Sequence, residues 1–539
     1  MRSLLLAVCA VLALPVLGVL GAWLAFDAEA WAVLAHQADT VLGGYVVQSL
    51  LLAGLVALGV ALVGGGAAAA VALFEFPGRR VFEWALLLPL AVPAYVLAYV
   101  YTDTLQPSGA LQTALREATG ARGALWPDVR SLPGAVVLFV LALYPYAYLL
   151  VRNALAERGI QLMEAARLLG AGLWRRIGSV ALPLARPALV AGVALALMET
   201  LADYGVGAYF GLTTLSTGVY KAWLVMNDRI AAAQLASALL VLVVLVLGAE
   251  RRARRDLRFA TQRPAAPLEG RPVRLRGRLA LLAWSLCAIP VLLGFVLPAA
   301  MLVQGVWREA TYGEFGLPLA RFARWCWNSF SLAGIAAVAA ALLAVALAFG
   351  MRTFARTPSG WMARALRGGV RLVGLGYALP GTVIAVGILI PLGAVQARWP
   401  QAPAAALVTG TALGLVYAYL VRFAAVALQS VEAGYERLPP SLDESARMLG
   451  ASRARLLTQV HAPLLRRSVL AAMLLVFVDV MKELPATLVL RPFDSDTLAV
   501  VAYNLARDER LAEAALPSLA IVAVGLLPVL LLVRAMRRA

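Results

Sequence analysis

Lysine is nearly absent from this chain of 539 residues, whose 47 basic residues include only Lys221 and Lys482. Neither lysine follows a glycine, so the phosphate-binding pattern G-x(4)-G-K-[ST] does not occur. If ATP drives this protein, another chain must bind the nucleotide. We therefore expect no cofactor to be bound by this chain.

Cysteine and histidine are also rare, and their positions share no metal-ligand spacing. Neither a zinc cluster nor a disulfide framework is supported, so we expect no catalytic residues and no stable metal site. The residues concerned are Cys9, Cys287, Cys326, His36 and His461.

Charge is sparse as well: 14% of the residues are charged and 62% are hydrophobic, with a mean hydropathy of +0.83. No soluble domain averages that apolar a composition, so the sequence predicts an all-α polytopic membrane protein. Twelve apolar runs are predicted to span the bilayer, six on each side of an arginine-rich linker, and the first is too long for a cleavable signal sequence. The runs are Leu4–Phe26, Tyr45–Phe74, Trp84–Thr102, Pro133–Val151, Pro187–Gly205, Ala231–Ala249, Leu279–Gln304, Asn328–Met351, Leu372–Gln396, Pro403–Val421, Ser468–Leu490 and Ala514–Val533.

The distribution of positive charge predicts an orientation for these spans. With the amino terminus inside, 34 of the 47 lysines and arginines fall in cytoplasmic segments. The positive-inside rule therefore predicts that both termini are cytoplasmic. The net charge of +18 is explained by this topology, and nucleic-acid binding has no support.

Each set of six spans contains one long polar interruption of the same pattern. Residues 163–189, MEAARLLGAGLWRRIGSVALPLARPAL, match residues 443–470, DESARMLGASRARLLTQVHAPLLRRSVL, at a constant offset of 280 residues. Six of eight residues are identical from Glu164 to Ala171, and the register continues to Pro183. A register held over this length indicates two copies of one unit.

Each copy is predicted to be a short helix, a glycine stop and a second short helix that ends at a proline. Glu164 stands in the opening turn, where a carboxylate suits the helix dipole. Gly170 and Gly450 stand where a helix requires a left-handed cap. The second helix is basic and amphipathic, so we expect the unit to lie along the membrane surface.

The two copies resemble the EAA loops, E-A-A-x(3)-G, of binding-protein-dependent ABC importer permeases. The resemblance implies the type I ABC importer permease fold, with about 12 helices in two homologous six-helix halves. It also implies a bacterial inner membrane, a cytoplasmic ATPase dimer that docks on the loops, and a periplasmic substrate-binding protein. Ser445 departs from the motif only as one small residue for another. The implied docking residues are Glu164, Ala165, Ala166, Gly170, Pro183, Glu444, Ser445, Ala446, Gly450 and Pro463.

The domain organisation follows from this repeat. Residues 1–250 form the first half and contain the first EAA-like loop at 157–186. Residues 251–278 form a basic cytoplasmic linker. Residues 279–539 form the second half and contain the second EAA-like loop at 432–467.

The halves also match outside these loops. Ser49 pairs with Ser329 at the offset of 280, and Pro93 pairs with Pro380 at a shifted offset. We interpret the prolines as ordinary membrane-helix kinks. The outer loop at 103–132 is long only in the first half, where it serves either as a connector or as a contact for an external partner.

The fifth and eleventh spans carry acidic residues, which spanning segments usually avoid. Glu199 and Asp203 match Asp479 and Glu483, and each pair shares one helix face at i, i+4. The sequence leaves two interpretations open: the acids line a translocation path, or the helices end early and Lys482 pairs with Asp479. Transient metal contacts are possible at the four acids under the first interpretation. The path candidates are Glu199, Asp203, Tyr204, Asp479, Lys482, Glu483 and Pro485.

The stretches METLADYGVGAYFGLTTLSTGVYKAW and VMKELPATLVLRPFDSDTLAVVAYNLA resemble the fused two-half ferric-iron transport permeases. This resemblance covers nearly the whole chain and implies transport of iron(III) from a periplasmic binding protein to the cytoplasm, with ATP hydrolysed on a separate subunit. Permeases for thiamine or another small solute are the main alternative. A secondary transporter also uses repeats and intramembrane acids, but it has no need of two docking loops.

Overall fold

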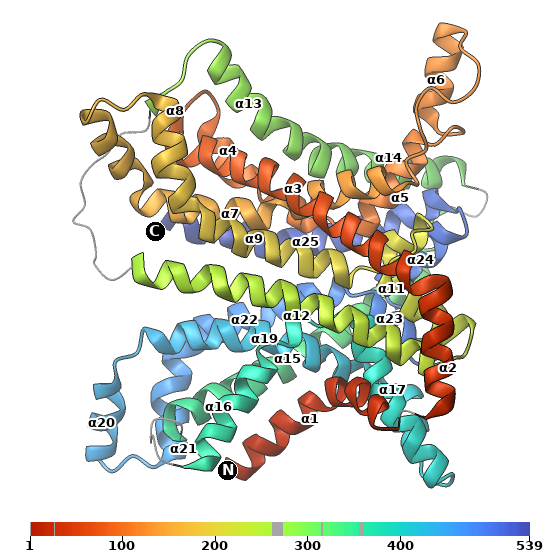
Figure 1. Cartoon of the computed structure of the whole chain (residues 1–539), viewed down its shortest axis with the longest axis vertical. Coiled ribbons are helices and arrows are strands. Elements are labelled where there is room, and N and C mark those ends of the chain that lie inside the picture. Colours follow the sequence, from red (N-terminus) through yellow and green to blue (C-terminus); the bar gives the residue numbers. More distant parts are fainter. Residues whose placement is uncertain (1, 26, 261–272, 314–315, 355–359, 539) are drawn as a thin grey trace. The chain divides into compact units, whose positions relative to one another are not determined.

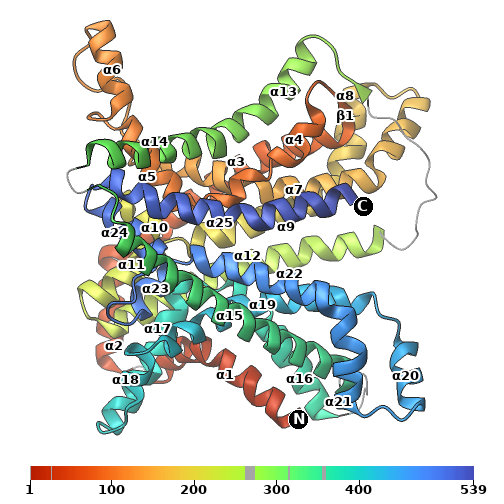
Figure 2. The ribbon, with the colours of Figure 1, turned by 180° about the vertical axis from the view of Figure 1, so that it is seen from behind.

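The computed structural model describes residues 2–25, 27–260, 273–313, 316–354 and 360–538, so residues 261–272 of the predicted linker lie outside the described residues (Figures 1 and 2). Helices make up most of the described chain, which confirms the all-α polytopic class. The chain divides into two compact units. Unit 1 comprises residues 1–36, 219–237 and 319–500, and unit 2 comprises residues 37–218, 238–318 and 501–539.

Unit 1 contains the following elements: α1 (Arg2–Gly21), η1 (Ala22–Ala25), η5 (Lys221–Val225), α15 (Leu319–Phe354), α16 (Trp361–Val373), η7 (Gly376–Ala378), α17 (Gly381–Arg398), α18 (Ala404–Thr409), α19 (Ala412–Glu436), α20 (Pro440–Met448), α21 (Arg453–Arg455), η8 (Leu456–His461), α22 (Ala462–Lys482) and α23 (Pro485–Leu490). Four helices have residues in both units: α2 (Ala28–Gln37), α11 (Leu215–Tyr220), α12 (Arg229–Ala260) and α24 (Leu498–Arg507).

Unit 2 contains the remaining described elements: η2 (Ala38–Leu42), α3 (Gly43–Leu73), β1 (Phe74–Glu75), α4 (Arg79–Ala85), η3 (Leu88–Ala91), α5 (Ala94–Leu105), α6 (Ala110–Thr119), α7 (Leu132–Leu168), α8 (Leu173–Arg176), η4 (Ile177–Ala181), α9 (Leu182–Ala202), α10 (Gly205–Tyr209), β2 (Val273–Arg274), α13 (Arg278–Val291), η6 (Leu292–Val296), α14 (Leu297–Tyr312) and α25 (Leu511–Arg538). The two strands pair in parallel, Phe74 with Val273 and Glu75 with Arg274.

Ten helices of the described chain are long and apolar enough to cross a membrane, or eleven if one bent pair counts as a span. Twelve were predicted, and two of the predicted spans account for the difference. The span Trp84–Thr102 is bent by 89° where α5 begins after Pro93, because proline cannot donate a backbone hydrogen bond. The span Ser468–Leu490 is interrupted because α22 ends at Lys482.

Unit 1 includes a span from each sequence half. Its centre consists of α15, α19 and α22, which pack against one another, while α1 packs on α16 and α17. The α1–α17 contact is backbone to backbone: a Cβ added to Gly387 would lie 2.0 Å from the carbonyl oxygen of Pro15, and one added to Gly18 would lie 2.3 Å from the carbonyl oxygen of Gly387. Glycine at both positions therefore permits this close helix pair.

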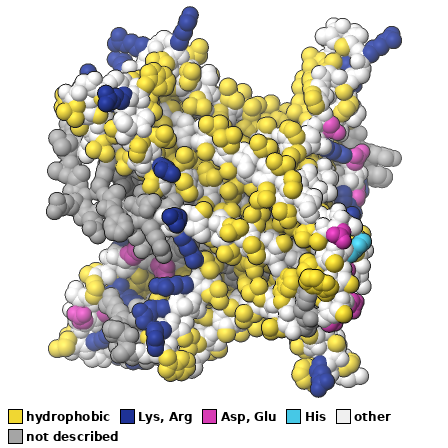
Figure 3. Space-filling view, viewed as in Figure 1, with side chains coloured by type: hydrophobic (Ala, Val, Ile, Leu, Met, Phe, Trp, Pro, Cys, Tyr) yellow, Lys and Arg dark blue, Asp and Glu magenta, His cyan; other side chains and the backbone are white. Residues whose placement is uncertain are grey.

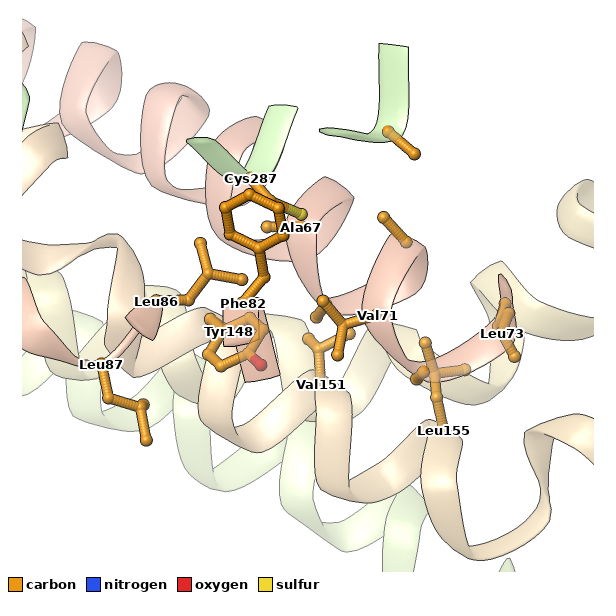
Figure 4. Packing of buried hydrophobic residues seen from close by; sticks show 14 of the residues in the cluster. Ala67, Val71, Leu73, Phe82, Leu86, Leu87, Tyr148, Val151, Leu155 and Cys287 are labelled. Atoms are coloured by element: carbon orange, nitrogen blue, oxygen red, sulfur yellow. The ribbon is translucent and has the colours of Figure 1, made fainter. Parts of the chain in front are cut away.

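Unit 2 shows the reciprocal arrangement. Its centre is α3, α7 and α9, and the span formed by α13, η6 and α14 packs on α3 and α25 although it begins the second sequence half. Figure 4 shows side chains of α3, α4, α7 and α13 meeting in one apolar cluster, among them Val71, Phe82, Tyr148 and Cys287. The first span of the first half, α1, thus packs in unit 1, which otherwise consists mainly of the second half. The first span of the second half, from α13 to α14, packs in unit 2, which consists mainly of the first half.

The surface of each unit is consistent with a membrane protein. In Figure 3 the middle of the visible face of each unit is mostly hydrophobic. Lys and Arg side chains gather at the end of unit 2 that carries α8 and at the end of unit 1 that carries α20 and α21. At the opposite end of unit 2, α6 projects outward from the predicted outer loop (Figures 1 and 2).

The contact between α1 and α17 can be tested by adding a side chain. Gly387→Val should destabilise the protein by about 1–3 kcal/mol, because overpacking forces two helix backbones apart. Gly334→Val in α15 is the matched control, since a Cβ at Gly334 meets no atom within 4 Å. Thermal unfolding of the purified chain in detergent measures both, and equal melting shifts would contradict the close contact.

Candidate functional site

The first helix of the EAA-like unit differs between the two loops. In the second loop it is the separate helix α20, which begins at Pro440 directly after Pro439. In the first loop it is the end of α7, which runs unbroken for 37 residues. The prediction of a short helix was therefore right for the second copy and wrong for the first, because Gly159 and Ile160 stand where the second loop has its two helix-breaking prolines.

The glycine stop has the same geometry in both loops. The φ angles of Gly170 and Gly450 are +81° and +79°. The N–H of Ala171 donates to the carbonyl of Ala166 at 3.0 Å, and the N–H of Ala451 donates to the carbonyl of Ala446 at 3.0 Å. This six-residue hydrogen-bonded closure with a left-handed glycine is the Schellman motif, which confirms the predicted cap.

The second helix of each loop does not end at its proline, contrary to the prediction. Helix α8 continues through the π-helical turn η4 into α9, and α21 continues through η8 into α22. Pro183 and Pro463 are the second residues of α9 and α22. The π-helical turn shifts the hydrogen-bond register, so a proline without an N–H fits at that point without ending the helix.

Both loops expose a pair of large apolar side chains directly before the glycine. Leu168 and Leu169 are 83% and 88% exposed, and Met448 and Leu449 are 88% and 87% exposed. The two pairs occupy equivalent positions at the offset of 280. Apolar side chains this exposed, next to a polar rim, mark a contact surface for another protein.

The other predicted docking residues lie around these pairs. Glu164 is half-buried and approaches Arg167 at 3.8 Å, whereas Glu444 is exposed. Ala165 and Ser445 are exposed, and Ala166 and Ala446 are half-buried. Every predicted docking residue thus lies on the helix that carries the exposed pair, at its glycine stop, or at the start of the following span.

A buried polar network holds the second loop in unit 1. The guanidinium of Arg352, at the end of α15, donates to both carboxylate oxygens of Asp443 at 2.7 and 2.9 Å, and it also donates to the carbonyls of Tyr435, Leu438 and Pro439. His461 contacts Asp443 at 3.0 Å through Nε2 and the hydroxyl of Tyr435 at 3.2 Å through Nδ1. The side chains of Arg352, Asp443 and His461 are 7%, 4% and 0% exposed.

Burial opposes ionisation of Asp443, but the hydrogen bonds from Arg352 and His461 outweigh it and lower the pKa of this carboxyl. The carboxylate therefore remains charged at neutral pH and keeps α20 attached to α15 and η8. This network ties the second loop to the helices of its own unit.

The first loop has apolar residues at the four equivalent positions. At the offset of 280, Arg352, Tyr435, Asp443 and His461 correspond to Ala72, Leu155, Met163 and Ala181. All four belong to the buried apolar cluster of unit 2, in which Figure 4 shows Leu155 beside Val151. The same loop geometry is thus held by charge and hydrogen bonds in unit 1 and by apolar packing in unit 2.

The acidic residues of the fifth and eleventh spans stand at helix breaks. Helix α9 ends at Ala202, and α22 ends at Lys482. Asp203 then accepts a hydrogen bond from the N–H of Val206 at 2.8 Å and caps α10. Glu483 accepts from the N–H groups of Ala486 and Thr487, each at 2.9 Å, and caps α23. Both helices therefore end directly before an acidic residue that caps the next short helix.

The remaining path candidates lie beside the same two breaks. Glu199 and Asp479 occupy the last turns of α9 and α22. Tyr204 follows Asp203 and contacts the hydroxyl of Tyr503 at 3.3 Å, and Pro485 begins α23. Glu199, Asp203 and Tyr204 belong to unit 2, while the other four candidates belong to unit 1. Within the described parts of the chain, no group of three or more His, Cys, Asp or Glu residues is placed to hold a metal ion.

Sequence reasoning missed the partner of Glu483. Arg422 Nη1 lies 3.4 Å from Glu483 Oε1, and the two side chains are 9% and 1% exposed. The predicted span ended at Val421 and placed Arg422 in a cytoplasmic segment, but α19 extends from Ala412 to Glu436 and puts Arg422 near its middle. The available signal was Glu483 itself, because a buried carboxylate requires a cationic or hydrogen-bonding partner.

Comparison with known proteins identifies the family. The model of the family described as "Binding-protein-dependent transport system inner membrane component" matches residues 61–258 and 353–539. This chain belongs to that family. It is the permease component of a binding-protein-dependent ABC transporter, a multi-pass inner membrane protein and not itself an enzyme.

Two relatives in this comparison align with most of the chain. The "Fe(3+)-transport system permease protein FbpB 2" of Haemophilus influenzae is 24% identical over 495 residues, covering 90% of this chain and 88% of the relative. The "Ferric transport system permease protein FbpB" of Actinobacillus pleuropneumoniae is 25% identical over 524 residues, covering 90% of this chain and 70% of the relative. The "Molybdenum transport system permease protein ModB" of Escherichia coli is 31% identical over 135 residues, covering 25% of this chain and 57% of the relative. The resemblance to fused ferric-iron permeases is therefore confirmed.

The role of Asp443 in holding the second loop is testable by substitution. Asp443→Asn should destabilise the loop locally by about 3–5 kcal/mol, because it leaves the buried Arg352 without its anionic partner. Hydrogen exchange of residues 440–448 should then accelerate, whereas Met163→Leu in the first loop should leave exchange nearly unchanged because the volume is conserved. Since the pKa of Asp443 is lowered by folding, wild-type protection is complete above about pH 4 and lost as the pH falls through the folded-state pKa. Slow exchange in Asp443→Asn would contradict this role.

Proposed function

We propose that this permease imports ferric iron, received from a periplasmic binding protein and driven by ATP hydrolysis on a separate cytoplasmic ATPase dimer. Both termini and both EAA-like loops lie in the cytoplasm under this proposal. The chain itself binds no nucleotide. One observation supports the coupling of ATP hydrolysis to transport: both loops have the same glycine-capped geometry and the same exposed apolar pair.

Each EAA-like loop acts as a docking element for one ATPase subunit. The exposed Leu168–Leu169 and Met448–Leu449 pairs supply the apolar contact, and the left-handed glycine fixes the angle between the docking helix and the span that follows. Because α8 and α21 follow the glycines and continue into α9 and α22, a displacement of α8 or α21 moves a complete span. Those two spans end at Ala202 and Lys482, where the acidic residues stand.

The substrate assignment is supported by the relatives and by the acids at the helix breaks. Two relatives that cover 90% of this chain are named as ferric permeases. Carboxylates are hard oxygen donors, which suit a hard trivalent cation. We assign the transient contacts to the acids at the helix breaks, Glu199, Asp203, Asp479 and Glu483, of which Glu483 also pairs with Arg422 and caps α23. Contacts of this kind favour passage, since a deep binding site would prevent release.

The coupling role of the glycines can be tested by substitution. Gly170→Val together with Gly450→Val should strain each left-handed cap by about 1–2 kcal/mol and lower the stimulation of ATP hydrolysis by loaded binding protein about tenfold or more. Gly172→Val is the matched control, because Gly172 has a φ of −63° and a Cβ there meets no atom within 4 Å. ATPase assays in reconstituted vesicles measure this stimulation. Normal stimulation in the double variant would show that the loops do not couple ATP hydrolysis to transport.

The path role of the acids requires a transport measurement. Glu199→Gln together with Asp479→Asn should slow radiolabelled iron uptake about tenfold while ATP hydrolysis continues, since each lost charge weakens the cation's interaction by an amount on the order of 1 kcal/mol. If Asp479 instead only holds Lys482, adding Lys482→Met should restore uptake. Wild-type uptake in the double variant, or full restoration in the triple variant, would refute the path role.

A further inference from the structure

Five buried tyrosines surround the helix breaks of unit 2. Tyr95 and Tyr99 lie on α5, immediately after the bend at Pro93, and Tyr204 and Tyr209 begin and end the segment that follows α9. Tyr503 lies on α24. All five are between 3% and 9% exposed. Two helix breaks that are distant in sequence therefore contribute phenol groups to one region of the unit.

The tyrosine rings form two sets of contacts, one of Tyr95, Tyr99 and Tyr209 and one of Tyr204 and Tyr503. The ring centroids of Tyr99 lie 5.7 Å from those of Tyr95 and 4.9 Å from those of Tyr209. The Tyr204 and Tyr503 rings are 5.9 Å apart, with their hydroxyls at 3.3 Å. Tyr503 and the carboxylate of Asp203 are both close enough to Tyr99 to act electrostatically on its hydroxyl. Tyr95, Tyr209, Tyr503 and Asp203 thus all lie within electrostatic range of the Tyr99 hydroxyl.

The repeated fold does not require tyrosine at these positions. Helix α17 of unit 1 begins after Pro380 as α5 begins after Pro93, and α23 follows α22 as α10 follows α9. Four of the five tyrosines have no phenol at the equivalent position of unit 1. Tyr95, Tyr99, Tyr204 and Tyr209 correspond to Thr382, Val386, Leu484 and Val489.

The hydroxyl of Tyr99 is buried and has no hydrogen-bond partner among the described residues. Phenylalanine would fill the same space without burying an unsatisfied polar group, so packing alone does not explain a tyrosine here. Tyr99 also lines a cavity of about 150 Å³ between α5, α14 and α25. Arg308 also lines this cavity, and Asp103 lines both it and an adjoining one of about 280 Å³. The wall of the second cavity carries more acids than cations: Asp103, Glu309, Glu509 and Glu513 against Arg130 and Arg510. Carboxylate oxygens, with arginines among them, thus line the cavities that reach Tyr99.

We propose that these five tyrosines and Asp203 form a transient binding site for the ferric ion on its path through the permease. Phenolate and carboxylate oxygens are hard ligands, and tyrosine is an established ligand of iron in proteins. A phenol that coordinates the ion releases its proton to water, and it takes a proton up again when the ion leaves. This inference rests on ferric iron being the substrate, but it adds a ligand type and a location in one unit only.

The cation closest to the cluster is already neutralised. The guanidinium of Arg130 lies 4.8 Å from the ring centroid of Tyr209 and 3.2 Å from its hydroxyl. Arg130 also pairs with Glu509 at 3.2 Å. Burial raises the pKa of Tyr209, and Arg130 offsets part of that rise while its own charge is balanced by Glu509.

The experiment uses the full chain with its ATPase and binding protein in reconstituted vesicles, and the purified chain with ferric nitrilotriacetate. The purified wild type should show a visible phenolate-to-iron charge-transfer band, and Tyr99→Phe together with Tyr204→Phe should abolish it. The same double variant should reduce radiolabelled iron uptake by at least about tenfold, as for the loss of groups around other metal ligands. Tyr144→Phe is the matched control, because Tyr144 is equally buried and its hydroxyl is also unpartnered, but it lies in the apolar cluster of Figure 4 and outside the tyrosine cluster.

The outcomes distinguish a failure of the proposed tyrosine site from a failure of the proposed ferric substrate. Loss of the band and of uptake in Tyr99→Phe with Tyr204→Phe, with Tyr144→Phe unchanged, would establish the site. Wild-type uptake in the double variant, or an equal loss in Tyr144→Phe, would overturn the site while ferric transport stands. Failure of the native transporter to import iron at all would remove the proposed substrate, and this site with it.

Discussion

Every helix break in this permease must satisfy the backbone groups that it frees, because a bilayer offers them no water. Four side chains do this at equivalent places in the two units. Asp203 and Glu483 accept hydrogen bonds from the first turns of α10 and α23. Ser49 and Ser329 accept from the N–H groups of Leu215 and Leu498 at 2.9 and 2.8 Å. The breaks can therefore sit at fixed positions along spans that would otherwise run straight.

The same requirement explains why acidic residues occur there at all. A carboxylate accepts several hydrogen bonds at once, so one side chain can end one helix and begin the next. In unit 1 the resulting charge is balanced by Arg422, which is buried beside Glu483. In unit 2 the equivalent of Arg422 is Ala142, and phenol groups instead surround Asp203 and Tyr204. The two units thus share a backbone plan and differ in the chemistry of their helix breaks.

The sequence predicted those features that depend on local pattern. Hydropathy predicted most of the spans, and the repeat of 280 residues located both glycine caps, whose φ angles agree within a few degrees. Features that depend on distant contacts were not predictable in this way. Arg422 was assigned to a cytoplasmic segment because hydropathy cannot show that Glu483 neutralises it. The network around Asp443 likewise depends on Arg352, which lies 91 residues away in sequence. The packing of α1 in unit 1 likewise depends on the fit between Gly18 and Gly387, which no periodicity reveals.

The different attachment of the two loops also affects how each can change during evolution. At Leu155, Met163 and Ala181, one apolar residue can replace another of similar volume in a single step with little loss of stability. At Arg352, Asp443 and His461, any single replacement leaves a buried charged or polar group without its partner, so these positions must change as a set. The apolar attachment of the first loop can therefore change one residue at a time, whereas the polar attachment of the second loop must change at several residues together.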